Sequence, residues 1–241
     1  MEEVCALKVR IKFAKEGMMK FIGHLDIMRY FQKAIRRAEL PIAYSEGFSP
    51  HMILSFAAPL GVGITSLGEY FDMELTREMP TEEIRRRLDQ EMVEGMRVLS
   101  ARRVPDGKAS KAMSLVAAAD YRILFREGRQ PSGGWKEKAA EFFAQESIVI
   151  WRKTKRSEKE TDIRPWIYRM EVQGEDLWMQ VSTGSVSNLK PELVMDAFAA
   201  FLGEELPADA YQVRREEVYA NIGEDGNRVL KSLEDLGEEV E

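Results

Sequence analysis

Apolar and polar residues alternate along several short stretches of the chain, and stretches with helical spacing separate them in a fixed order. Residues 5–13 carry an apolar side chain at every second position, which is typical of a strand with one buried face. The order strand, helix, strand, strand, helix, strand is predicted at 4–104 and again at 119–219. This repeated order predicts an α+β fold made of two tandem ferredoxin-like (βαββαβ) modules, each with helices on one sheet face and the other face free.

The remaining elements follow from the same periodicities. In the first module we predict a helix over 24–39, strands at 42–44, 52–57, 70–75 and 96–104, and a helix that begins at Thr81. In the second module we predict strands at 121–125, 148–153, 166–172 and 177–181, helices at 135–142 and 191–201, and a last strand from Tyr211. The predicted division is a module over 1–107, a linker over 108–118, a module over 119–221 and a frayed acidic tail over 222–241.

Composition excludes several classes of protein. The chain has a single cysteine, Cys5, so it forms no internal disulfide and supplies no cysteine-ligated zinc or iron–sulfur centre. Cys5 falls on the apolar phase of its strand, which predicts a buried thiol. We expect no membrane association, because no run of about 18 apolar residues is present. The start Met1-Glu2-Glu3 is unlike a signal peptide, and the expected location is the cytoplasm.

Charge is unevenly distributed along the sequence. The formal net charge is −6, yet residues 8–37 hold nine Lys or Arg against two acidic residues. Residues 223–241 hold seven acidic residues against two basic ones. A basic N-terminal stretch predicts an anionic partner for the first module, and the acidic stretch predicts a solvated tail.

Two basic clusters are candidate phosphate-binding surfaces. The first combines one face of the predicted helix with the polar face of the first strand: Arg29, Lys33, Arg36 and Arg37 with Lys8, Arg10 and Lys12. The second is the run 152–159, where Trp151 and Trp166 are candidates for stacking on bases. The alternative for the first cluster is a solvated helix face, and for the second an exposed hairpin with aromatic core contacts.

The two histidines are the candidates for acid–base catalysis. His24 opens the first predicted helix, and His51 follows Ser49-Pro50 in a turn. The alternative is that each hydrogen-bonds the backbone at the end of an element. Their spacing matches no metal-binding motif, so we expect no metal site.

Four segments of the first module carry a resemblance to a known family: Phe21–Arg29, Arg36–Pro41, Tyr44–His51 and Gly68–Asp72. Together with the later Asp162–Pro165, they resemble the radical SAM-associated family of uncharacterised function. Members are fused to a radical S-adenosylmethionine protein or encoded beside one. The family usually shows Asn-Pro-His-Pro where this chain has Ser49-Pro50-His51-Met52. The resemblance is strongest over 5–76.

The resemblance implies a radical SAM protein as the partner. The iron–sulfur cluster and S-adenosylmethionine are then expected only in that partner, and no cofactor in this chain. Family members are often encoded near genes for ribosomes and RNA processing, which implies structured RNA as a second partner. The ligand-binding or docking residues that the motifs imply are Tyr44, Ser45, Phe48, His51, Glu69 and Arg164.

Three functions stay open at this point. The first is a non-catalytic accessory subunit that presents RNA or an RNA–protein substrate to a radical SAM protein. The second is a metal-independent RNA-processing enzyme that uses His24 or His51. The third is a pure protein–protein adaptor whose basic surface docks an acidic partner.

Overall fold

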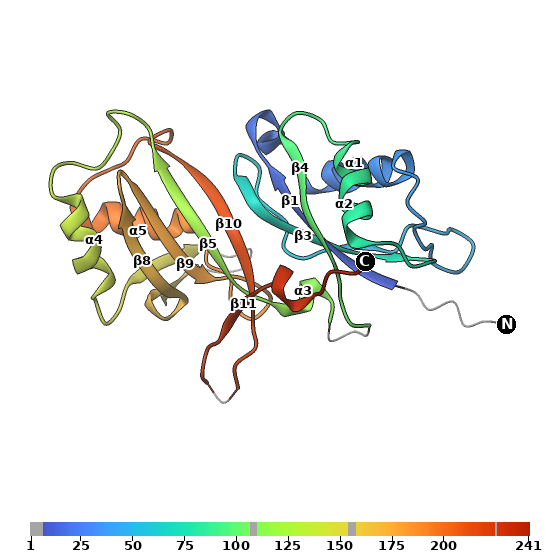
Figure 1. The fold of residues 1–241 in the computed structure, drawn as a ribbon. Helices are drawn as coiled ribbons and strands as arrows, with labels where there is room; N and C mark the ends of the chain where they lie inside the picture. The colour runs from blue at the N-terminus through green and yellow to red at the C-terminus, as the bar shows by residue number, and fades with distance from the viewer. Residues whose placement is uncertain (1–6, 107–109, 154–157, 225) are drawn as a thin grey trace. The chain divides into compact units, whose positions relative to one another are not determined.

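The chain has a mixed α+β fold in which strands predominate and helices are few (Figure 1). The computed structural model describes residues 7–106, 110–153, 158–224 and 226–241. The chain divides into two compact units, of which unit 1 comprises 1–116 and 217–241, and unit 2 comprises 117–216. Unit 1 is thus built from both ends of the sequence, which differs from the predicted linear order of module, linker, module and tail.

Unit 1 contains a sheet in which β1 lies between β4 and β3, and β2 pairs with the other edge of β3. These three pairings are antiparallel. The elements of unit 1 before β10 are β1 (Leu7–Lys15), η1 (Gly17–Phe21), α1 (His24–Arg37), β2 (Leu54–Phe56), β3 (Thr65–Leu75), α2 (Thr81–Asp89), β4 (Met96–Arg103) and α3 (Ala112–Leu115). After β10 come β11 (Leu230–Ser232) and η3 (Glu234–Leu236).

Helices α1 and α2 share an apolar core with one face of this sheet. The alternating residues Val9, Ile11 and Phe13 of β1 are at most 1% exposed, as the sequence pattern predicts. The ring of Phe31 in α1 lies 4.6 Å from that of Phe13 and 4.8 Å from that of Phe71 in β3. These edge-on and tilted ring contacts fix α1 over the centre of the sheet.

The opposite face of the unit 1 sheet holds a buried ion pair. Arg10 is 1% exposed, and its guanidinium donates to both carboxylate oxygens of Asp72 at 2.8 and 3.2 Å. It also donates to the backbone carbonyls of Ser110 at 2.8 Å and Leu233 at 3.1 Å. Asp72 in turn accepts the N–H of Ala112 at 2.8 Å. This face is therefore covered, and the prediction that it is free is wrong for unit 1.

The acidic C-terminal segment is an ordered part of unit 1 and not a frayed tail. Strand β11 pairs with β10, and Leu233 is fully buried. Further on, Glu238 exchanges two backbone hydrogen bonds with Arg103 at the edge strand β4. The carbonyl of Val240 accepts the N–H of Thr81, the first residue of α2. The segment stays ordered because it supplies the carbonyl that Arg10 needs and covers an otherwise open strand edge.

In unit 2, β5 lies next to β9, and β9 next to β8, with antiparallel pairings. A separate two-stranded sheet is formed by β6 and β7. The elements are β5 (Val116–Phe125), α4 (Trp135–Phe143), β6 (Val149–Lys153), β7 (Glu158–Asp162), η2 (Arg164–Trp166), β8 (Ile167–Gln173), β9 (Asp176–Ser182), α5 (Pro191–Leu202) and β10 (Tyr211–Asn221), whose residues from 217 on belong to unit 1.

The two helices of unit 2 pack against each other through buried phenylalanines. The rings of Phe142 in α4 and Phe198 in α5 lie 5.3 Å apart, and each side chain is at most 1% exposed. As predicted, Pro191 is the first residue of α5. Gly203 ends the helix in the left-handed conformation (φ 72°), which glycine adopts without a steric penalty.

The sequence periodicity identified most elements but missed those without a repeat. Residues 42–44 form only isolated bridges, from Ile42 to Leu75 and from Tyr44 to Met52. The expected linker at 108–118 is shorter, because α3 is followed directly by β5 from Val116. Neither η1, with five residues, nor β11, with three, was predicted, since each is too short to show a repeating pattern. Cys5 lies outside the described residues.

The buried ion pair predicts a large cost for removing its negative partner. Asp72→Asn leaves the Arg10 guanidinium buried without a compensating charge, which costs about 3–5 kcal/mol. The matched control is Glu16→Gln, which breaks the exposed pair with Arg97 and should cost about 1 kcal/mol or less. Urea unfolding followed by circular dichroism measures both. Equal midpoints for the two variants would contradict the role given to Asp72.

A second prediction concerns acid stability in unit 2. Burial alone would raise the pKa of Glu216, but its hydrogen bonds from Arg122 (2.7 Å) and Arg214 (2.8 Å) outweigh burial and lower it. The ionised carboxylate therefore stabilises the fold above its unfolded pKa of about 4.3. That contribution is lost as the pH falls through the lower, folded pKa.

Glu216→Gln should therefore reduce stability at pH 7 and flatten the decline in melting temperature between about pH 4.5 and pH 3. Thermal unfolding at several pH values checks this. The control is Glu171→Gln in β8, which breaks an exposed pair with Arg169. A Glu216→Gln profile parallel to the unmodified protein throughout would contradict the assignment.

Candidate functional site

The β1–α1 connection carries the first family-like motif and projects from unit 1. Glu16 anchors it, because its N–H donates to the carbonyl of Gly95 at 2.7 Å. A side chain at Gly95 would meet the carbonyl oxygen of Glu16 at 2.7 Å, and its φ is +85°. Only glycine fits this close approach. On the other side, Lys15 donates its ammonium to the carbonyl of Ile22 at 2.9 Å, so both ends of η1 are fixed.

Four large apolar side chains in and beside this connection are more than half exposed. We call them the motif surface: Met18 (76%), Phe21 (54%), Leu25 (63%) and Val62 (63%). The N–H of Gly63 donates to the carbonyl of Lys20 at 2.8 Å, which ties the loop of Val62 to η1. Sequence reasoning did not select these residues, although Phe21 and Leu25 lie inside the quoted motif. Exposure of an apolar residue has no sequence signal of its own.

His24 is the first residue of α1 and half-buried beside the motif surface. Its ring meets the ring of Phe56 in β2 edge-on, with 5.2 Å between centroids. Asp26, two residues on, pairs with Arg29 at 3.2 Å. The described partner of His24 is thus an aromatic ring, whereas a general base is usually oriented by a carboxylate or carbonyl.

His51 lies in a hairpin tip that projects from unit 1. Its Nδ1 is 2.8 Å from the hydroxyl of Ser45, which also accepts the N–H of His51 at 3.1 Å. The N–H of Ser45 donates to the carbonyl of His51 at 2.9 Å, so the two residues close the tip. Within this tip Phe48 is fully exposed, and Tyr44 is 47% exposed. The imidazole of His51 thus bonds a side-chain hydroxyl and not the backbone, whereas its own N–H and carbonyl close the turn.

The two histidines do not form a pair. His51 precedes Phe56 by five residues of largely extended chain, which span roughly 16 Å. Phe56 is the residue that His24 contacts. No hydrogen bond or ring contact joins His24 to His51 in the described part of the chain. A mechanism that needs both imidazoles at one bond therefore has no geometric support.

The basic face of the first strand is used inside the protein. Lys8 is 5% exposed and donates to the Ser110 hydroxyl at 3.3 Å, and Arg10 is held by Asp72. Lys12 is paired with Glu217 at 2.7 Å and with Glu234 at 3.0 Å. Tyr70 donates to the same Glu217 at 2.7 Å; burial first, and then this carboxylate, raise the pKa of the phenol. The prediction that these three cations face a phosphate backbone is not supported by their positions.

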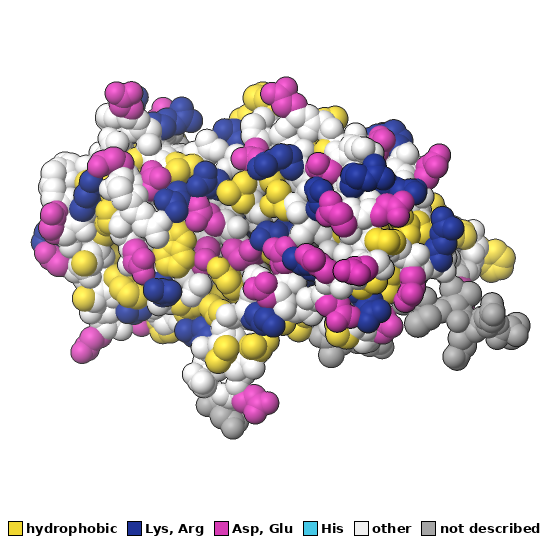
Figure 2. Space-filling view, viewed as in Figure 1, with side chains coloured by type: hydrophobic (Ala, Val, Ile, Leu, Met, Phe, Trp, Pro, Cys, Tyr) yellow, Lys and Arg dark blue, Asp and Glu magenta, His cyan; other side chains and the backbone are white. Residues whose placement is uncertain are grey.

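The outer face of α1 keeps its basic residues at the surface. Arg29, Lys33, Arg36 and Arg37 are all exposed. Arg37 pairs with Glu91 at 2.6 Å, whereas Lys33 and Arg36 make no ion pair with any described residue. On the face shown in Figure 2, Lys and Arg side chains are interspersed with Asp and Glu and form no continuous basic area.

Two further predicted site residues are buried or partly buried. Glu69 is 5% exposed in β3, opposite Phe13 of β1. Arg164 lies in unit 2, whereas the other ligand-binding residues that the motifs imply lie in unit 1. It donates to the carbonyls of Gln145 and Ile167, both at 3.0 Å, and its guanidinium lies 4.1 Å from the Phe143 ring centroid. These contacts give Arg164 a structural role in joining η2 to α4.

The second basic run forms part of the β6–β7 hairpin. The guanidinium of Arg152 lies 5.5 Å from the centre of the Trp166 ring and donates to the carbonyl of Asn188 at 3.1 Å. Trp151 is 70% exposed. Lys155 and Arg156 lie outside the described residues. Of the two aromatic candidates, Trp166 is engaged by the protein and Trp151 faces solvent.

No group of three or more His, Cys, Asp or Glu could hold a metal ion in the part of the chain that the structure describes. None of the described helices combines the length and apolar character needed to cross a membrane.

Comparisons with known proteins identify the family of the chain and give remote structural likenesses. No curated protein matches. A chain of the crystal structure titled as a Cbf5–Nop10–Gar1 complex is 12% identical, with a TM-score of 0.42; the match covers 87% of this chain and 48% of that one. An unknown protein from Galdieria sulphuraria is 12% identical, with a TM-score of 0.23; the match covers 82% of this chain and 90% of that one. This chain thus spans about half the length of the matched chain from the Cbf5–Nop10–Gar1 complex.

Neither likeness carries an argument about function. The family comparison is more informative, because it covers most of the sequence. Residues 8–191, which include β1, the motif surface and α1, match a family described as uncharacterised protein conserved in bacteria (DUF2344), and the chain belongs to that family.

Proposed function

We propose that this chain is a non-catalytic accessory subunit that docks a radical SAM protein through the motif surface. The observation that carries the proposal is the exposure of Met18, Phe21, Leu25 and Val62, each more than half exposed, in the segment that matches the family. Contiguous exposed apolar side chains on a protein surface mark interaction sites. Burying them against a partner removes apolar area from water, which is the main favourable term in association.

The hairpin tip supplies a second contact in this proposal. Phe48 is fully exposed on a tip closed by Ser45 and His51. A large aromatic side chain presented on a hydrogen-bonded turn loses little conformational entropy when it enters a partner's pocket. We therefore give His51 and Ser45 the role of holding Phe48 in position.

The choice of an accessory subunit over an enzyme rests on what the histidines contact. His24 meets an aromatic ring, and His51 closes a turn. A metal-independent RNA-processing enzyme would need at least one imidazole aimed at a substrate-sized hollow. The radical chemistry, its cluster and S-adenosylmethionine belong to the partner in this proposal, and the site of action is the cytoplasm. The partner's identity comes from the motif resemblance.

The fold assignment behind the proposal is two ferredoxin-like modules. In unit 1 the spatial order β4-β1-β3-β2 with antiparallel pairings supports it. In unit 2 the order β5-β9-β8, with β6–β7 inserted between α4 and β8, supports the same plan. Such a plan presents helix faces and loops for binding, and function is decided by the side chains placed there.

The docking proposal predicts that polar substitutions on the motif surface weaken a complex without unfolding the chain. Met18→Ser/Leu25→Ser should reduce affinity for a radical SAM protein of the same organism by about tenfold or more, as expected when central apolar anchors are lost. Isothermal titration calorimetry with the purified partner measures it. Because both side chains are mainly exposed, the melting temperature should change little.

The matched control is Ile222→Ser, which replaces an apolar side chain of unit 1 that is 52% exposed and distant in sequence from the motif. Its affinity should equal that of the unmodified chain. Two results oppose the proposal. Equal weakening by the control would remove the special role of the motif surface, and absence of a complex at tens of micromolar would remove the partner.

A second candidate function, RNA binding, is favoured by the outer face of α1. Arg29, Lys33 and Arg36 lie at i, i+4 and i+7 on one helix face, and all are exposed. Three such cations spaced along a helix can contact successive phosphates. The strand cations that the sequence added to this surface are buried or paired, so the proposed RNA surface is smaller than predicted.

The size of this surface predicts a shallow salt dependence. With about three phosphate contacts, the slope of log affinity against log salt should be about −2 to −3. Fluorescence anisotropy with labelled structured RNA from about 50 to 200 mM salt measures it. Lys33→Glu/Arg36→Glu should abolish binding at the lowest salt, whereas the control Lys136→Glu/Lys138→Glu on α4 of unit 2 should retain it. Binding that survives the first pair would place any RNA site elsewhere.

A further inference from the structure

Helix α5 and the loop that follows it carry only negative charge. Residues 191–210 contain five carboxylates, Glu192, Asp196, Glu204, Glu205 and Asp209, and no Lys, Arg or His. Two hollows of unit 2 adjoin this helix, and Asp196 and Ala200 line both of them. The two hollows are therefore neighbours across one ridge of α5.

The first hollow is an apolar groove of about 440 Å³ between α5, the end of α4 and β6. Its walls include Ile148, Val149, Trp151, Leu193 and Phe201. Trp151 is 70% exposed and Val149 is 57% exposed, so two large apolar side chains at the groove face water. Among the described strands β6 pairs only with β7. Residues of β6 therefore remain available to line the groove.

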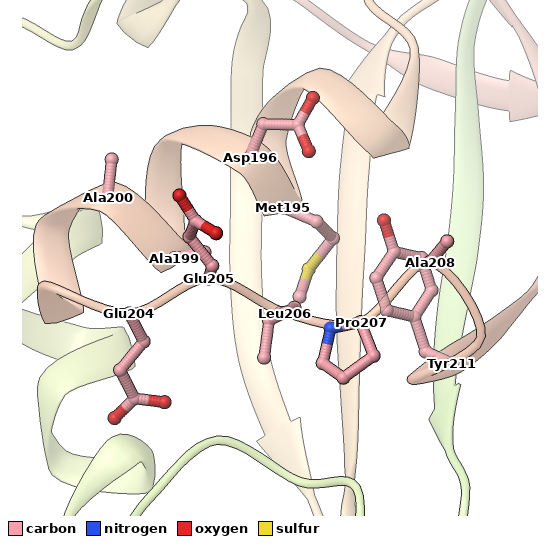
Figure 3. A pocket seen from close by; sticks show the side chains of 10 residues that line it. All are labelled: Met195, Asp196, Ala199, Ala200, Glu204, Glu205, Leu206, Pro207, Ala208 and Tyr211. Carbon is pink, nitrogen blue, oxygen red and sulfur yellow. The ribbon is translucent and has the colours of Figure 1, made fainter.

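The second hollow is a pocket of about 390 Å³ between α5 and the 204–208 segment (Figure 3). Met195, Leu206 and Pro207 form its floor between the helix and Tyr211 (Figure 3). Glu204 points away from the other two carboxylates in Figure 3 and accepts the N–H of Ser132. Asp196 and Glu205 are left as the acidic groups of the pocket rim.

The local field at this pocket is negative. Burial first, and then the carboxylates of Asp196 and Glu192, raise the pKa of Tyr211 to about 12. The carboxylates oppose the negative charge that the phenol would gain on ionisation, and the same field attracts a cation. One oxygen of Glu192 is buried and has no hydrogen-bond partner among the described residues. A buried carboxylate oxygen without a donor is costly, and a cationic group placed nearby would offset that cost.

We propose that the α5 surface, defined as the apolar groove with Trp151 and the adjoining pocket with Asp196 and Glu205, binds a peptide segment of a partner protein that carries bulky apolar side chains next to lysine or arginine. The groove takes the apolar side chains, and the carboxylates take the cations. Charge complementarity selects this occupant, because residues 191–210 offer carboxylates and no cation. The same carboxylates would repel phosphate groups.

This inference does not depend on the proposed function, because the motif surface lies in unit 1 and the α5 surface in unit 2. The two can therefore fail separately. Variants of Met18 and Leu25 report on the first surface, and variants of Trp151 and Asp196 report on the second.

The experiment uses the full chain and four labelled probes: a peptide of alternating leucine and lysine, one of alternating leucine and glutamate, one of serine and lysine, and spermine. Fluorescence anisotropy should show the leucine–lysine peptide binding at least tenfold more tightly than the other peptides, with spermine weaker still. Its affinity should fall as salt rises, since part of the attraction is between charges.

The variants locate the site. Trp151→Ser and Asp196→Lys should each weaken the leucine–lysine peptide by about tenfold, the effect of losing one central contact. The controls are Met113→Ser, an apolar residue of unit 1 that is 55% exposed, and Glu127→Lys, an exposed residue of unit 2 outside the pocket; both should bind as the unmodified chain does. Circular dichroism and melting temperature should confirm that every variant folds.

Four outcomes would overturn the proposal. Unchanged affinity in folded Trp151→Ser and Asp196→Lys would place binding elsewhere. Equal binding of the leucine–glutamate peptide would remove the charge selection, and equal binding of the serine–lysine peptide or spermine would remove the role of the groove. Sedimentation that shows Trp151-dependent dimers in the absence of peptide would make a second copy of this chain the occupant.

Discussion

The architecture of unit 1 depends on one buried guanidinium. Arg10 lies in the middle of β1, and burial of its charge is tolerated only because Asp72 on the neighbouring strand neutralises it. Asp72 leaves three of the five guanidinium N–H groups to other acceptors. The carbonyls of Ser110 and Leu233 accept two of those N–H groups, and these residues come from the segment after β4 and from the C-terminal part of the chain. The ion pair is thus the reason that unit 1 is assembled from two distant parts of the sequence.

This constraint also determines which charges are left for partners. Around the ion pair, Lys12 is neutralised by Glu217 and Glu234. Carboxylates of the acidic C-terminal segment, Glu234, Glu238 and Glu239, form ion pairs within unit 1. The basic strand, which predicts an anionic partner in the sequence, and the acidic stretch, which predicts a solvated tail, instead take part in one internal electrostatic network. What remains at the surface of unit 1 is the outer face of α1 and the apolar motif surface. In physical terms this favours a protein partner over a long phosphate backbone, which would need more free cations.

The elements with strong local patterns could be predicted, and the long-range pairings could not. The alternation of Val9, Ile11 and Phe13 and the helix from Pro191 to Gly203 follow from local periodicity and end signals. The same alternation places Arg10 on a polar face, which normally means solvent. Its burial depends on Asp72, 62 residues away, and on Leu233, 223 residues away. Of the three leucines in this acidic stretch only Leu233 is buried, and one buried side chain gives no periodic signal, so the ordered C-terminal segment was predicted as a frayed tail.

The candidate site shows the same division. The motif resemblance selected a region in which unit 1 presents exposed side chains, at η1 and at the hairpin tip of Ser45 and His51. Polar residues in a motif suggest catalysis or ligand binding. Here they close turns and fix loops, and the exposed groups that they position are apolar. The same holds in unit 2, where Arg164 joins η2 to α4 while Trp151 on the nearby hairpin faces solvent. In both units the polar residues of the motifs build the scaffold, and aromatic or aliphatic side chains beside them are the groups that face solvent. In the docking functions that we propose, specificity comes from the shape and charge around those apolar side chains.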